Sequence, residues 1–152
     1  MAEKGGLRGP AQAFGAQLVR NVMAFDGNPG AGEAGSGHDL FLVTGSVIVR
    51  LLCVCTENLA VSNGATVEVG IAGATAAIIA QTTASAIISG EIWHDASPDA
   101  AMEALGVWAQ YVIAGGTDII MTVASANVTD GTLVFSCFWT PLVDGSTVIA
   151  GG

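Results

Sequence analysis

The sequence predicts an all-β fold, a β-sandwich or jelly-roll-like body of about eight antiparallel strands that follows an N-terminal extension. Short apolar segments follow one another along most of the chain, with turn residues roughly every ten positions. Within several of these segments the apolar side chains recur at every second position, the period of a strand. We found no internal repeat.

The first 37 residues differ from the rest and are expected to form an N-terminal arm and a glycine-rich linker, with the body at residues 38–152. Between Gly27 and Gly37 the chain is rich in glycine, as linkers are. Before it, Phe14, Leu18 and Val22 recur every fourth position. This spacing predicts a short amphipathic helix over about residues 11–24, whose apolar face must rest on the body or on a neighbouring subunit.

The body is expected to consist of strands joined by turns. Asn63-Gly64 and Asp130-Gly131 have the composition of tight hairpin turns. The segment 46–55 is apolar on both faces, which is typical of a strand inside a sandwich or at an interface. A single helical turn is expected near 98–105. The expected strands are 39–43, 46–55, 66–71, 75–80, 84–88, 91–93, 108–113, 118–124 and 132–139.

Charge is distributed unevenly along the chain. All four basic residues lie in the first 50 positions, and the net charge of −9 therefore belongs to the acidic body. Such a body repels phosphates, so nucleic-acid binding is not expected. Two interpretations stay open: the acidity only keeps the protein soluble, or it forms an outer surface while a mildly basic arm docks elsewhere.

The composition is unusual for a soluble monomer, with 51% hydrophobic and 11% charged residues. A membrane protein is one explanation. However, the longest uncharged run, residues 69–90, is interrupted by glycine, serine, threonine and glutamine, and lacks a flanking basic cluster. The N-terminus also lacks the apolar core of a signal peptide. We therefore expect no membrane association, and a surface that is partly covered by other protein chains in a large cytoplasmic assembly.

Few residues suggest chemistry. Glu91, His94 and Asp95 form the densest polar cluster and are of metal-ligand type, more suited to an oxygen-ligated ion such as Ca²⁺ than to Zn²⁺. On a continued strand, however, His94 would point away from the other two, and a turn explains the cluster equally well. His38 and His94 are the only near-neutral bases, and no catalytic motif is present. We expect no enzyme, no cofactor and no metal site.

Cysteine and tryptophan are expected to have structural roles. Cys53, Cys55 and Cys137 form no metal or redox motif, and buried free thiols are the favoured interpretation. Tryptophan side chains fill cores and interfaces, although they also form sugar-binding platforms. The three tryptophans, expected as core or interface anchors, are Trp93, Trp108 and Trp139.

Residues 37–145 resemble small β-rich proteins encoded among the head genes of tailed bacteriophages. The stretches that carry the resemblance are "GHDLFLVTGSVIVRLLCVCTENL", "VEVGIAGATAAIIAQTTASAI", "EIWHDASPD" and "GTDIIMTVASANVTDGTLVFSCFWTPLVDG". The most specific parts are "EIWHD" and the later "FWTPL". Members of this group are virion proteins of the decoration or head-fibre kind. The resemblance implies a non-enzymatic capsid decoration protein on the outside of the phage head, with the major capsid protein and further copies of itself as partners.

A decoration protein is expected to bury apolar strands against copies of itself, most simply as a homotrimer. The arm lies outside the resemblance, and its role as capsid anchor is a hypothesis that rests on the change of composition near residue 37. The residues expected to anchor it are Arg8, Phe14, Leu18, Arg20 and Val22. Two other functions stay open: a receptor- or glycan-binding head-fibre or tail module that uses the tryptophans, and a hydrolase on a β-sandwich.

Overall fold

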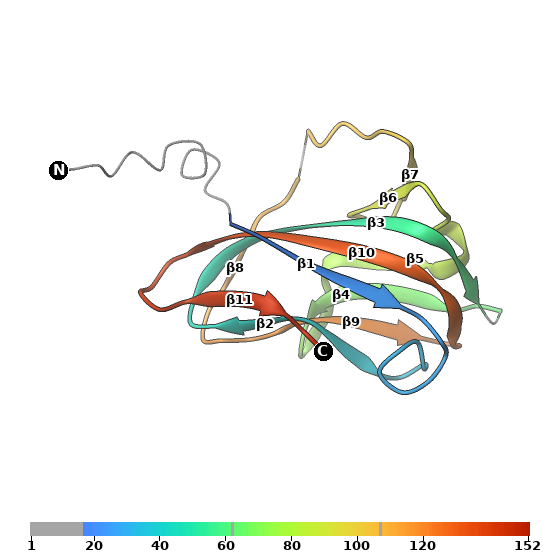
Figure 1. The fold of residues 1–152 in the computed structure, drawn as a ribbon, viewed down its shortest axis with the longest axis horizontal. Helices are drawn as coiled ribbons and strands as arrows, with labels where there is room; N and C mark the ends of the chain where they lie inside the picture. Colours follow the sequence, from blue (N-terminus) through green and yellow to red (C-terminus); the bar gives the residue numbers. More distant parts are fainter. Residues whose placement is uncertain (1–16, 62, 107) are drawn as a thin grey trace.

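The computed structural model describes residues 17–61, 63–106 and 108–152, and it confirms the predicted β-sandwich. Two antiparallel sheets face each other, with β1, β10 and β3 in one layer and β11, β2 and β9 in the other (Figure 1). The strands are β1 (Gln17–Ala24), β2 (Gly37–Thr44), β3 (Val47–Val61), β4 (Thr66–Ile71), β5 (Ala74–Thr83), β6 (Glu91–Trp93), β7 (Asp99–Ala100), β8 (Tyr111–Ile113), β9 (Ile119–Ala124), β10 (Val128–Pro141) and β11 (Thr147–Ala150).

Most connections pass from one sheet to the other. The first sheet has the order β1-β10-β3-β6-β7 with β8 also paired to β3, and the second has the order β11-β2-β9-β4-β5. Of the strands described, β4–β5 and β6–β7 alone are neighbours both in the chain and in a sheet. The long strands β3 and β10 pair along most of their length and form the centre of the first sheet.

Neither predicted hairpin turn joins two paired strands. Asn63-Gly64 links β3 to β4, which lie in different sheets. Asp130-Gly131 lies inside β10, where the pairing with β3 shifts register. Gly131 has a φ of 106° at this β-bulge, and a Cβ there would lie 2.5 Å from the carbonyl oxygen of Asn58. The Asp-Gly pair therefore supplies a bulge, which needs the same backbone freedom as a turn.

The predicted helix over residues 11–24 is wrong from residue 17 onward, because Gln17–Ala24 forms β1 and pairs with β10. Its side chains alternate, with Met23 in the core while Leu18 and Val22 stay exposed. A spacing of four residues fits a strand as well as a helix, since it is twice the strand period of about 2 residues and close to the helical period of about 3.6. Pairing with β10 satisfies the backbone of this segment and decides between the two.

The glycine-rich segment after β1 packs on the sandwich. The backbone of Gly32 accepts a hydrogen bond from Val128 N at 2.9 Å, and Asn127 Oδ1 accepts one from Ala34 N at 3.0 Å. A Cβ at Gly32 would lie 2.0 Å from the carbonyl oxygen of Val128. Glycine here permits close approach to the start of β10. The described part of the expected arm, residues 17–37, is thus built into the sandwich.

Two shorter predictions also differ from the structure. Residues 84–88, expected as a strand, begin with a 3₁₀ turn, η1 (Ala84–Ala86). Residues 98–105, expected to hold a helical turn, contain the short strand β7 and then irregular chain. No helix of the described residues is long and apolar enough to cross a membrane.

Candidate functional site

The outer surface of the first sheet is one candidate site. Along β3 and β10, every second side chain enters the core, and those between them face outward. Exposure is largest at the margins, where Leu18 is 44%, Val22 59% and Val112 67% exposed. We call this surface the outer face; it is formed by Leu18, Arg20 and Val22 of β1, Ile48, Arg50, Leu52 and Val54 of β3, Ile92 of β6, Val112 of β8, and Val134, Ser136, Phe138 and Thr140 of β10.

The register aligns these side chains in rows across the sheet. Leu18, Phe138 and Arg50 are paired positions on neighbouring strands, as are Arg20, Ser136 and Leu52. Arg20 and Arg50 are the basic residues that the structure describes, and the acidic side chain that adjoins the outer face is Asp99 of β7, paired with Ile92 at the far edge of the sheet. The surface is thus apolar with two guanidinium groups, on a protein whose remaining charge is strongly negative.

Of the five residues expected to anchor an arm, the structure brings three onto this face. Leu18, Arg20 and Val22 point outward from β1, while Arg8 and Phe14 lie outside the described residues. The three on β1 form the edge of a sheet surface and do not line the face of a helix.

The tryptophans divide between core and surface. Trp93 and Trp139 are buried, and Trp93 packs edge-on against Phe135 with ring centroids 6.1 Å apart. Trp108 is half-buried, lies edge-on to Phe138 with centroids 5.2 Å apart, and has the Arg50 guanidinium 5.4 Å from its ring centre. Its indole N–H donates to Leu51 O at 2.9 Å. Trp108 therefore extends the outer face, where it holds Arg50 by a cation–π contact.

All three cysteines are buried free thiols, as predicted. Burial raises the pKa of the Cys137 thiol to about 12 and also raises the pKa of Cys53 and of Cys55. A thiol with a raised pKa is a poor nucleophile and metal ligand at neutral pH, because the thiolate is the reactive form. Their role is packing.

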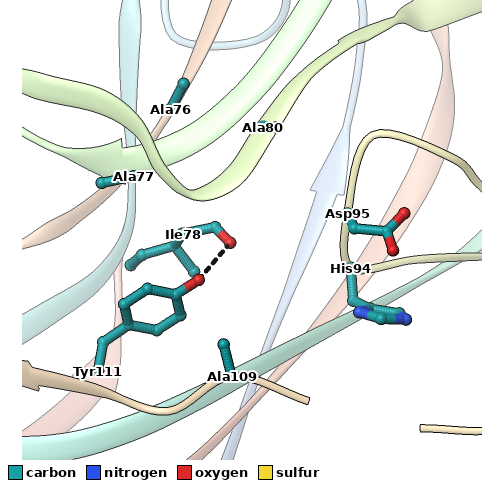
Figure 2. Close-up of a pocket in the computed structure, with 8 residues that line it drawn as sticks. All are labelled: Ala76, Ala77, Ile78, Ala80, His94, Asp95, Ala109 and Tyr111. Carbon is teal, nitrogen blue, oxygen red and sulfur yellow. Dashed lines mark hydrogen bonds between the residues drawn. The ribbon is translucent and has the colours of Figure 1, made fainter. Parts of the chain in front are cut away.

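A second candidate site is a small pocket between β5 and the chain that follows β6. It has a volume of about 240 Å³ and is lined by Ile78 and alanines of β5, by Tyr111, and by His94 with Asp95. Figure 2 shows His94 and Asp95 one above the other on one side, and Tyr111 with Ile78 on another. The Tyr111 hydroxyl donates to Ile78 O at 3.1 Å, so it is already engaged.

His94 and Asp95, which line the pocket, lie close to Glu103, which the sequence analysis did not group with them. His94 Nε2 lies 2.6 Å from Glu103 Oε1, and ligand atoms of His94, Asp95 and Glu103 all lie within 4.8 Å of one another. Strand β6 ends at Trp93, so the alternation that separated His94 from Asp95 does not apply to them. Glu91, which the sequence grouped with these two, is not part of this cluster.

The other histidine lies in the opposite sheet. His38 on β2 is buried, and neither of its ring nitrogens has a hydrogen-bond partner. Burial lowers its pKa, while the nearby carboxylates of Asp39 and Glu33 act in the opposite direction. A neutral, enclosed imidazole of this kind is a core residue and offers no base to a substrate.

Comparisons with protein-family models, with curated proteins and with solved structures gave no match to this chain.

Proposed function

We propose that this chain is a structural, non-enzymatic subunit of a tailed-phage virion, a decoration protein that binds the outer surface of the head and stabilises it. The virion assignment rests on the resemblance of residues 37–145 to small phage head proteins. The observation that carries the binding role is the outer face, a broad apolar sheet surface that contains Arg20 and Arg50 and meets an acidic side chain, Asp99 of β7, only at its far edge beside Ile92. Contiguous apolar surface of this kind marks a protein–protein contact, since water solvates it poorly.

The charges favour one orientation. Nine acidic residues and no basic residue follow Arg50 in the sequence, so the rest of the body is negative. A partner for the outer face needs an apolar strip flanked by carboxylates, which the two guanidinium groups would pair. We assign this role to the major capsid protein. The acidic remainder of the sandwich then faces solvent on the particle.

The β-sandwich suits this task because it is rigid. β3 and β10 are paired along twelve positions in the centre of the first sheet, and their inward side chains form one continuous core with those of the second sheet. A standard interface of about 800 Å² per partner, at about 25 cal/mol per Å² of apolar area, gives ample gross stabilisation before association costs are subtracted. A homotrimer remains our proposal for the oligomer, and sedimentation velocity of the purified chain tests it.

The receptor- or glycan-binding alternative depended on the tryptophans. Trp93 and Trp139 are buried and offer no stacking surface, while Trp108 is covered in part by Phe138 and Arg50. No pair of exposed aromatic rings among the described residues favours a sugar platform. We therefore retain the structural function.

Quantitative mass spectrometry of purified phage particles tests the proposal. A decoration protein is present in hundreds of copies per particle, comparable to the capsid protein. A handful of copies would indicate a tail or fibre component, and absence from the particle would refute the virion assignment altogether.

A further inference from the structure

The loop after β7 places the Glu103 carboxylate against the His94 imidazole and close to the Asp95 carboxylate, at the edge of the pocket. Side chains of His94 and Glu103 are 8% and 14% exposed, so both groups are largely withdrawn from water. Glu103 Oε1 meets His94 Nε2, but Glu103 Oε2 is buried with no hydrogen-bond partner. A buried carboxylate oxygen without a donor is costly.

Neither arginine of the described residues serves this site, since Arg20 points outward from β1. No lysine or arginine follows Arg50, and Arg50 itself lies over the Trp108 ring on the outer face. His94, Asp95 and Glu103 bring one imidazole and two carboxylates together in a small volume. A divalent ion would balance the two carboxylates and would be coordinated by Glu103 Oε2, which has no hydrogen-bond partner.

The donor atoms are positioned for such an ion. Asp95 Oδ1 accepts a hydrogen bond from Ser97 N at 2.7 Å, which fixes the carboxylate and leaves Oδ2 free. Ligand atoms around a four-coordinate zinc lie roughly 3.3 Å apart, given metal–ligand distances of about 2.0 to 2.2 Å. The three donors lie within 4.8 Å of one another, and an ion would replace the direct contact between His94 Nε2 and Glu103 Oε1.

We propose that His94, Asp95 and Glu103 form a binding site for a divalent transition-metal ion of the Zn²⁺ or Mn²⁺ class. One imidazole nitrogen with two carboxylate oxygens suits these ions, whereas Ca²⁺ takes six to eight oxygen ligands. The ion would tie the end of β6 to the loop after β7. The adjoining pocket of about 240 Å³ leaves room for water as the remaining ligand.

Isothermal titration calorimetry of the full chain with Zn²⁺ at neutral pH tests the site. We expect saturable binding of one ion per chain and a rise of the melting temperature in its presence. Glu103→Gln and His94→Gln should weaken the binding by about 100-fold or more, because loss of even an outer-shell partner costs about 10- to 100-fold. Asp144→Asn, a change at an exposed carboxylate between β10 and β11, serves as the matched control and should bind as the unaltered chain does.

X-ray absorption spectroscopy of the zinc-loaded chain gives a readout that does not depend on the variants folding. Nitrogen and oxygen ligands without sulfur are expected. Sulfur in the coordination shell would instead place the ion on the cysteines and overturn the proposal. Absence of saturable Zn²⁺ binding, or equal binding by Glu103→Gln and the unaltered chain, would overturn it as well.

Discussion

Trp93 donates its indole N–H to the hydroxyl oxygen of Thr82 at 2.9 Å, across the interior of the sandwich. Trp93 belongs to β6 in the first sheet and Thr82 to β5 in the second, and both side chains are buried. The Thr82 hydroxyl in turn donates to Ala80 O at 2.9 Å. This polar link joins the two sheets near the edge at which the first sheet carries its short strands β6 and β7.

Thr82→Val keeps the shape of the side chain but leaves the indole N–H buried without an acceptor. We expect a loss of about 1–3 kcal/mol in the free energy of unfolding, measured by urea denaturation. Thr83→Val, at the exposed neighbouring position, is the control and should change stability by less than about 0.5 kcal/mol. Equal effects of both variants would mean that the link contributes nothing to stability.

The bulge at Gly131 should be far less tolerant of a side chain than the turn at Gly64. Both have positive φ, 106° and 87°, but a Cβ at Gly131 would meet Asn58 O while a Cβ at Gly64 meets open space. Gly64→Ala should cost about 1–2 kcal/mol of unfolding free energy from left-handed strain alone. Gly131→Ala should cost about 3 kcal/mol or more, or prevent folding. A similar melting temperature for the two variants would contradict the close backbone approach of Gly131 to Asn58 at the bulge.

Acid should destabilise the fold through His38. Burial holds its pKa below that of an unfolded histidine, so the folded state favours the neutral ring. The unfolded chain binds a proton more readily, and stability is therefore full above about pH 6.5 and falls as the pH drops toward the folded-state pKa. His38→Leu should lose less stability than the unaltered chain between about pH 7 and pH 5, as measured by urea denaturation. Parallel pH profiles for the two proteins would refute this role.

The three cysteine thiols should be unreactive in the folded protein. Cys53, Cys55 and Cys137 are buried, and burial raises the pKa of each thiol, that of Cys137 to about 12. A chromogenic disulfide reagent at about pH 8 should therefore modify no cysteine in the native chain and all three after denaturation. Rapid reaction of the native chain would show that the β3–β10 core opens.

Some of this architecture was accessible from the sequence because strand periodicity survives wherever one face is buried. Residues 118–124 and 132–139 follow this period in their burial and lie within or close to β9 and β10, whereas residues 66–71 alternate in sequence but form β4 with both faces buried. β1 was not accessible, since Phe14, Leu18 and Val22 fit either period and only the partner strand β10 decides. Asn-Gly and Asp-Gly report local backbone freedom, and whether that freedom makes a hairpin, a crossing or a bulge depends on pairing elsewhere.

The candidate sites were only partly predictable for the same reason. The cluster of His94 and Asp95 was visible, but its third member, Glu103, follows in an irregular loop whose path no local pattern specifies. For the outer face, the sequence predicted only that residues 46–55 form a strand with apolar side chains on both faces. Its extent depends on the register that β10 imposes on β1 and β3.

The outer face is the surface that we propose binds the phage head. Leu18 and Val22 are exposed and make no core contact, so Leu18→Glu with Val22→Glu should leave folding nearly unchanged. The same change should weaken binding to heads that were assembled without this chain by more than about tenfold, because two carboxylates would enter an apolar interface. Co-sedimentation with such heads measures the affinity, and circular dichroism checks the fold.

Ile149→Glu provides the matched control for that experiment. Ile149 is a 56% exposed apolar residue on β11, in the other sheet, and its replacement adds the same kind of charge away from the outer face. We expect it to bind heads as the unaltered chain does, because the proposed contact lies on β1, β10 and β3. If Ile149→Glu abolished binding and the double variant on β1 retained it, the docking surface would be the second sheet, and the charge argument from Arg20 and Arg50 would fail with it.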